Sequence, residues 1–192
     1  SQNTVPQAGT DFEVIEGVEL TQPGRSLLVE EYFSYGCIHC KNFDPELEAW
    51  LTTLPEDVEF ARKPTAFSRT WSILAQAYYA LEKAEALEGN HEQLFKGIHN
   101  GGRMFNSGED IADYLDSQAL PASEFMRAFN SRDVARRLNR ATEDTRRAGI
   151  RAVPTLVVAG KYRVGMTHGA QRALEVVEHL LEQERALLMK QS

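Results

Sequence analysis

The chain has 192 residues and a formal net charge of −7, with 42% hydrophobic and 26% charged residues. This ordinary globular balance argues against disorder, and the acidic charge argues against nucleic acid as the main partner. The apolar runs are far shorter than a membrane span, and no charged-then-apolar leader opens the sequence. We therefore expect a globular protein that either stays in the cytoplasm or is a mature form whose leader has been removed.

The first part of the chain alternates short strands with one helix. Apolar runs predict the strands, and from Cys40 onward apolar residues recur every three or four positions, which predicts a helix that contains Pro45. The predicted elements are an edge strand at Phe12–Ile15, a turn at Pro23-Gly24, and buried strands at Ser26–Phe33 and Val58–Arg62. Two strands joined by a helix form a βαβ unit.

From about Ser68 to Gly149 every periodic signal is helical. Ser107 with Asp110 three residues later has the pattern of a capping box, and Gly149 suits a helix C-cap. The predicted helices are Trp71–Leu87, His91–Ile98, Ser107–Gln118, Pro121–Phe129 and Asp133–Ala148. So long a helical stretch between two β-containing parts indicates an insertion rather than a linker.

The last of these helices carries the one basic cluster of the sequence. Its arginines are Arg132, Arg136, Arg137, Arg140, Arg146 and Arg147. They alternate with Asp133, Glu143 and Asp144, and mixed signs at helical spacing are typical of a solvated helix face. We therefore expect a solvated face here rather than a binding patch.

The β pattern returns after the helical stretch. The predicted elements are a strand at Val153–Val158, a turn at Ala159-Gly160, a partner strand at Lys161–Val164, and a helix from Thr167 or Gly169 to about Leu188. We expect an α/β fold in which residues 10–64 and 150–192 form one β-containing part and residues 65–149 an all-helical subdomain inserted into it.

The chain has two cysteines, Cys37 and Cys40, and two residues separate them. A strand that leads through Cys37 into a helix places this cysteine at the helix N-terminus, where unpaired N–H groups and the helix dipole favour a negative charge. We therefore expect a Cys37 thiolate at neutral pH, with its pKa well below the ordinary value. Cys40, one turn later, should be more buried, and His39 adds a positive charge near the sulfur when it is protonated.

A stabilised Cys37 thiolate favours the reduced pair, so its disulfide is an oxidant. The nearest alternative is a reductase or isomerase on the same fold. A third possibility is a non-catalytic peptide- or metal-binding module.

The two cysteines could also form a structural disulfide, but a disulfide across two intervening residues would add little stability. A zinc site would need two further ligands, and the histidines form no paired motif: His91, His99, His168 and His179. We expect no metal and no organic cofactor.

Glu30 and Glu31 interrupt the apolar strand before the cysteines. Glu31 shares its face with Phe33 and should point inward, where burial would raise its pKa and let it relay the proton of Cys40. Arg62, on the next strand, is its candidate partner. We expect Glu30 to lie at a solvated strand end.

Val153-Pro154-Thr155 opens the strand that follows the helical stretch. A proline is sterically allowed at a strand start. In a redox protein the same proline suggests a cis peptide bond that faces the cysteine pair and leaves the neighbouring backbone free to pair with an extended substrate. We favour the cis isomer.

Two segments together resemble the DsbA family of bacterial periplasmic disulfide oxidases: Phe33–Cys40, which ends in C-I-H-C and is followed by Phe43, and Gly149–Tyr162, which contains V-P-T. The helical insertion and Pro45 also fit, and the similarity spans nearly the whole chain. The resemblance implies a thioredoxin fold with an inserted helical subdomain. It also implies a periplasmic protein that oxidises newly exported chains and is reoxidised by a quinone-linked membrane partner. We expect a monomer.

The resemblance implies a role for each site residue. Cys37 would be the nucleophile, Cys40 the resolving thiol, His39 the residue that tunes the thiolate, and Glu31 the buried acid. Substrate binding would fall to Val153, Pro154 and Thr155. The sequence departs from the best-known members in three places: Ile38 stands where they have proline, Gly36 where they have an aromatic residue, and Arg62 where a lysine would pair with the acid. These departures concern oxidising strength and substrate preference rather than the reaction class.

Overall fold

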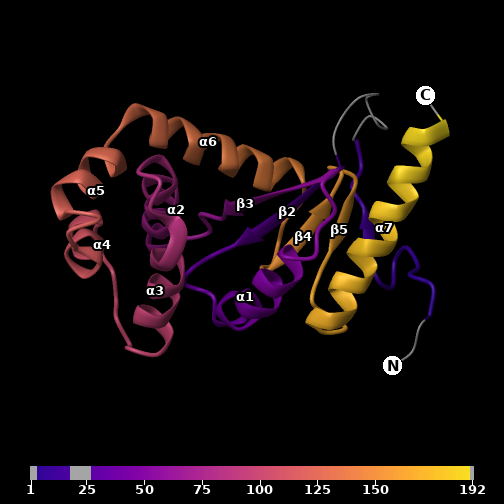
Figure 1. Cartoon of the computed structure of the whole chain (residues 1–192), viewed down its shortest axis with the longest axis horizontal. Helices are drawn as coiled ribbons and strands as arrows, with labels where there is room; N and C mark the ends of the chain where they lie inside the picture. The colour runs from indigo at the N-terminus through magenta and orange to yellow at the C-terminus, as the bar shows by residue number, and fades with distance from the viewer. Residues whose placement is uncertain (1–3, 18–26, 191–192) are drawn as a thin grey trace. The chain divides into compact units, whose positions relative to one another are not determined.

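The computed structural model describes residues 4–17 and 27–190 (Figure 1). The strands are β1 (Glu13–Val14), β2 (Leu27–Phe33), β3 (Val58–Pro64), β4 (Thr155–Val158) and β5 (Tyr162–Val164). The helices are α1 (Ile38–Leu51), α2 (Arg69–Lys83), α3 (Leu87–His99), α4 (Gly108–Leu115), α5 (Ala122–Phe129), α6 (Arg132–Arg147) and α7 (Ala170–Lys190). None of the described helices is both long and apolar enough to cross a membrane.

Every predicted strand and helix is present, with shifted ends. α1 begins at Ile38 rather than Cys40 and contains Pro45, and β4 begins at Thr155 rather than Val153. The predicted turn at Pro23-Gly24 lies outside the described residues, as does the first residue predicted for β2. The shift in α1 has a chemical consequence, because it places the first cysteine directly before the helix.

The chain divides into two compact units. The sheet unit comprises the described residues within 1–32, 43–63 and 147–192, and the helical unit comprises residues 33–42 and 64–146. Residues 33–42 contain both cysteines, so the helical unit holds the C-x-x-C motif. The domain boundaries expected at residues 64 and 149 remain a prediction.

The sheet unit is built on five strands in the order β1-β5-β4-β2-β3. β2 pairs antiparallel with β4, which places Glu31 opposite Leu156 and Tyr32 opposite Thr155. β4 and β5 form the predicted hairpin, in which Ala159 and Gly160 both have positive φ, 54° and 69°, as a tight turn requires.

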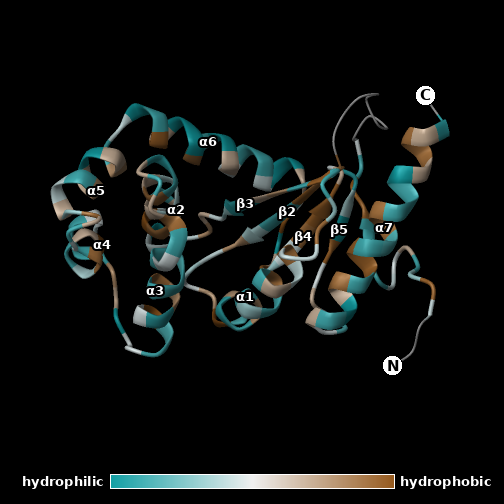
Figure 2. Cartoon of the chain, viewed as in Figure 1, coloured by the Kyte–Doolittle hydropathy of each residue, from teal (hydrophilic) through white to brown (hydrophobic). Residues whose placement is uncertain are grey.

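A hydrophobic core joins this sheet to α1 and α7. Leu47 of α1 and Leu180 of α7 are fully buried and belong to one cluster with Val29 of β2 and Val158 of β4. Figure 2 shows hydrophobic and hydrophilic residues alternating along α7, as expected for a helix with one buried face. Burying each large aliphatic side chain contributes about 1.5–3 kcal/mol, so this packing holds α1 firmly.

The helical unit has its own core and its own capping interactions. Ser68 accepts a hydrogen bond from the Trp71 N–H at 3.1 Å, and Ser107 accepts one from the Asp110 N–H at 3.2 Å, so the predicted N-cap is confirmed. Its fully buried large side chains include Leu81, Leu94, Ile111 and Phe125.

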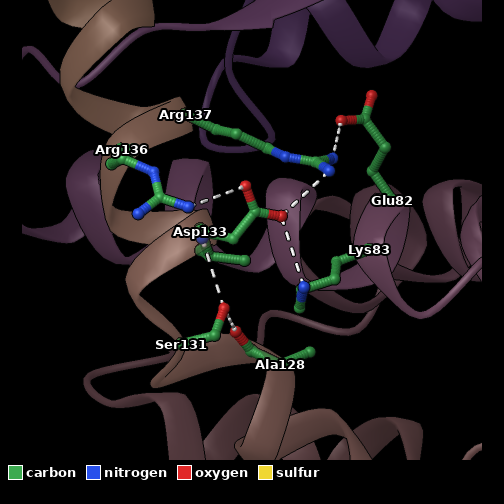
Figure 3. Close-up of polar contacts among 8 residues, drawn as sticks. Glu82, Lys83, Ala128, Ser131, Asp133, Arg136 and Arg137 are labelled. Atoms are coloured by element: carbon green, nitrogen blue, oxygen red, sulfur yellow. Dashed lines mark hydrogen bonds and ion pairs between the residues drawn. The ribbon is translucent and has the colours of Figure 1, made fainter.

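The arginine-rich face of α6 carries ion pairs (Figure 3). Asp133 lies 3.0 Å from Nη2 of Arg137 and 3.3 Å from Nζ of Lys83, and Nη1 of Arg137 lies 2.5 Å from Glu82. The Arg136 side chain is 69% exposed. These contacts confirm the prediction of a solvated helix face of mixed charge.

Candidate active site

Residues 34–37 form the turn that leads from β2 into α1. Ser34 is buried and closes this turn twice: its hydroxyl accepts a hydrogen bond from the Gly36 N–H at 3.0 Å, and its carbonyl accepts one from the Cys37 N–H at 3.1 Å. Because α1 begins at Ile38, Cys37 immediately precedes the first helical turn. Unpaired N–H groups at that end of the helix favour negative charge on the sulfur.

The two cysteines differ in exposure. Cys37 is partly exposed and Cys40 is fully buried, and no disulfide joins them in this structure. A hydrogen bond from the Cys40 side chain is the largest cause that lowers the pKa of Cys37, from 9.0 to about 5. Backbone hydrogen bonds from Cys40 and His39 and the charge of the exposed His39 lower it further, while burial opposes the shift. This pKa agrees with the predicted thiolate.

Sequence reasoning found the helix N-terminus and His39 but missed the main contributor to the low pKa, which is the thiol of Cys40. The signal was present in the spacing, because two intervening residues place the two side chains about one helical turn apart.

Gly36 leaves room for an aromatic side chain of α2. A Cβ atom at residue 36 would lie 2.4 Å from Nε1 of Trp71, so the indole packs directly against the backbone of the turn. Phe67 stacks on Trp71 with ring centroids 5.9 Å apart and is 48% exposed, and Ile38 is 44% exposed. The helical unit thus presents apolar side chains around the turn.

Within the sheet unit, Glu31 lies against Arg62 of β3, as predicted. Nε of Arg62 lies 3.2 Å from Glu31, and its Nη2 lies 3.2 Å from Asp44 and 2.6 Å from Glu48. One guanidinium therefore serves three carboxylates. Asp44 and Glu48 of α1 were missed by sequence reasoning, although their spacing of four residues places both on one helix face.

Burial raises the pKa of Glu31 to about 8, and the positive charge of Arg62 only partly offsets this effect. At neutral pH this carboxyl is therefore mostly protonated, and it can release or accept a proton in the pH range in which thiols react.

The expectation that Glu30 lies at a solvated strand end was wrong. Its side chain is 9% exposed and pairs with Lys63 at 2.7 Å, because β3 lies beside β2 in the sheet.

The segment Val153-Pro154-Thr155 opens β4 in the sheet unit. The Val153-Pro154 peptide bond is cis, as expected. The Thr155 hydroxyl donates a hydrogen bond to the carbonyl of Ala152 at 2.7 Å, which closes the loop across the proline.

The histidines considered as zinc ligands have other contacts. His91 and His99 both bond to Tyr35, and His168 bonds to the carbonyl of Thr10. Across residues 4–17 and 27–190, no three His, Cys, Asp or Glu side chains are grouped so as to hold a metal ion. The contacts to Tyr35 had no signal in the sequence.

A mixed sheet flanked by helices, with a C-x-x-C motif at a helix N-terminus and a cis proline at a strand start, defines a thioredoxin-fold redox protein. The model of the DSBA-like thioredoxin domain matches residues 28–181. The chain belongs to this family and is a thiol–disulfide oxidoreductase.

Relatives and solved structures agree with this assignment. The chain is 36% identical to the thiol:disulfide interchange protein DsbA of Azotobacter vinelandii over 171 residues, which cover 88% of this chain and 79% of that protein. It is 32% identical to the DsbA of Pseudomonas aeruginosa PAO1 over 186 residues, which cover 95% of this chain and 88% of that protein. A crystal structure of Pseudomonas aeruginosa DsbA superposes with a TM-score of 0.89 at 31% identity, over 95% of this chain and 96% of that chain.

Proposed function

We propose that Cys37 and Cys40 are the redox pair, and that the protein donates their disulfide to reduced, newly exported proteins. A substrate thiolate attacks Cys37, forms a mixed disulfide and breaks the Cys37–Cys40 bond. Cys40 leaves as a thiolate and takes up a proton. A second substrate thiolate then attacks the substrate sulfur of the mixed disulfide, and Cys37 leaves as a thiolate. The substrate loses two electrons and gains a disulfide, and both cysteines of the enzyme end reduced.

The low pKa of Cys37 carries this proposal. A sulfur that is stable as an anion is a good leaving group in the second step, and its stability favours the reduced form of the enzyme. His39 contributes through its backbone N–H and its charge. The pair itself supplies the redox chemistry without a metal or an organic cofactor.

Glu31 is the proposed proton donor for the Cys40 thiolate when the disulfide opens. Its raised pKa supports this role, because an acid of ordinary pKa would hold no proton at neutral pH. Arg62 cannot take over the task, since a guanidinium does not deprotonate in proteins. Arg62 therefore orients the carboxyl.

Substrate chains are proposed to pair with the backbone at Val153, Pro154 and Thr155, a role that rests on family membership. The exposed apolar side chains of Ile38 and Phe67 suit unfolded clients, which expose apolar residues of their own. Family membership also supports action in the periplasm as a monomer, with reoxidation by a quinone-linked membrane oxidase.

The test is the equilibrium with glutathione as a function of pH. The reduced protein releases a proton from Cys37 above pH 5, so the equilibrium should favour the reduced protein about tenfold more with each pH unit from 5 toward 8, and should level off below 5. The measurement is the fraction of reduced protein at fixed ratios of glutathione to its disulfide between pH 4 and 8. Cys37→Ser is the control and should show no exchange.

A reductase or isomerase on the same fold would give a different curve. Its first thiol would titrate near pH 8, and the equilibrium would stay nearly flat from pH 4 to 7. Such a curve, with a pair that glutathione leaves mostly oxidised, would reject the proposed direction but keep the redox pair. A binding module would show no exchange at all.

A further inference from the structure

Tyr35, in the middle of the 34–37 turn, is held at both ends by histidines of α3. Its hydroxyl lies 2.7 Å from Nδ1 of His91. Its backbone carbonyl lies 2.7 Å from Nε2 of His99, and a carbonyl only accepts, so the histidine donates this bond. Tyr35 is 1% exposed, and all three residues belong to the helical unit.

The bond between Tyr35 and His91 lies among aromatic rings. The ring of His91 packs against Phe33 and Phe95, with centroids 5.5 and 5.2 Å away, and Tyr35 packs edge-on against both rings. A polar pair buried in such surroundings costs desolvation energy that two apolar side chains would avoid. The hydrogen bond orients the tyrosine ring, because it fixes the position of the ring more precisely than apolar packing alone.

The carbonyl that His99 holds lies two residues before the reactive cysteine. With the two bonds of Ser34, the bond of His99 leaves little freedom to the backbone that ends in Cys37. The sulfur of Cys37 depends on the backbone N–H groups of His39 and Cys40, and such bonds weaken when donor and acceptor are misaligned.

We propose that His91 and His99 are positioning residues for the redox chemistry. By holding the ring and the carbonyl of Tyr35, they fix the turn that presents the Cys37 sulfur to the first turn of α1. They act through Tyr35 and not on the reacting atoms. The inference rests on the proposed role of Cys37.

The experiment compares His99→Ala and Tyr35→Phe with the intact protein. Each variant should shift the equilibrium with glutathione toward the oxidised protein, roughly three- to tenfold for the loss of one hydrogen bond. Thiolate absorbance should show Cys37 ionising at a higher pH in both variants. His99→Gln keeps a donor where Nε2 lies and should stay within about twofold of the intact protein.

His168→Ala is the matched control. It also removes a bond from a histidine Nε2 to a backbone carbonyl, 3.1 Å long, but in the sheet unit and far along the chain from the cysteines. It should leave both the equilibrium and the Cys37 titration unchanged.

Thermal unfolding of the oxidised and reduced forms separates positioning from simple support of the fold. If the histidines only support the fold, His99→Ala will lower Tm equally in both forms and leave the equilibrium constant unchanged, and this result overturns the inference. A His99→Gln variant as impaired as His99→Ala also overturns it. If His99→Ala fails to fold, Tyr35→Phe and His99→Gln decide the matter. Failure of the proposed function looks different, because the intact protein would then either not exchange with glutathione or show an equilibrium that stays nearly flat from pH 4 to 7.

Discussion

Arg62 of the sheet unit and Arg137 of the helical unit each contact more than one carboxylate, but in different surroundings. The Arg62 side chain is 13% exposed and contacts Glu31, which is 2% exposed. The Arg137 side chain is 34% exposed, and Asp133 beside it is 31% exposed. The contacts are of similar length, 3.2 Å in the buried pair and 3.0 Å in the exposed one.

The two carboxyls nevertheless respond in opposite directions. The pKa of Asp133 is lowered, first by its hydrogen bond with Lys83 and then by Arg137, whereas burial raises the pKa of Glu31 although a guanidinium is in contact. Proximity of charge is thus insufficient to predict the proton state of a carboxyl. Loss of water decides in the buried cluster, and the partner decides on the surface.

Replacing each arginine should give the largest difference in stability between the two clusters. Arg62→Met removes the buried cation that contacts Asp44, whose side chain is 12% exposed, and should destabilise the protein by about 3 kcal/mol at pH 7, the usual cost of breaking a buried pair. For a chain of this size that lowers Tm by roughly 6–12 °C. Arg137→Met is the matched control and should cost about 1 kcal/mol or less. Equal losses in thermal unfolding would show that the Arg62 cluster is solvated in solution.

Replacing each carboxyl by its amide should separate the two clusters by the pH dependence of stability. Glu31 ionises near pH 4.5 when unfolded and near 8 when folded, so the folded state keeps its proton longer and the protein loses stability as pH rises from 4.5 to 8. Glu31→Gln removes that loss, so its advantage should grow to a few kcal/mol, on the order of the pKa difference, by pH 8.

Asp133→Asn should behave with the opposite sign. Its folded pKa is lowered below 3.8, so the intact protein gains stability from this group at neutral pH and loses it as pH falls through the lowered value. Urea unfolding at pH 3, 5, 7 and 8 measures both variants. Parallel pH profiles of Glu31→Gln and the intact protein would contradict the raised pKa.

The sequence predicted most of the fold because local signals agree with the tertiary structure. The capping pattern at Ser107 and the apolar run of β2 each depend on neighbours within a few residues. The prediction for Glu30 failed because local signals do not report distant contacts. The burial of Glu30 depends on a contact with Lys63, more than thirty positions later.

The candidate site was predictable only in part, again because sequence patterns report only residues that are close along the chain. Cys37, Cys40 and Pro154 stand in short motifs, and Glu31 follows from strand periodicity. The contacts of Tyr35 with His91 and His99 join residues 56 and 64 positions apart, and no periodicity reports them. Parts of a site that come from distant elements need the folded structure.

Salt should give the smallest effect and the sharpest distinction between the two clusters. Raising NaCl from 0.1 to 1 M shortens the Debye length from about 10 to about 3 Å, which screens exposed charges but not buried ones. The pKa of Asp133 should therefore rise toward its ordinary value, because its partners act through solvent. The pKa of Glu31 should stay where it is, because burial sets it and salt does not enter the cluster. Carboxyl carbon NMR titrations at both salt concentrations measure this. A Glu31 pKa that moves as far as that of Asp133 would mean that water reaches the Arg62 cluster, and the proton proposed for Cys40 would then have to come from elsewhere.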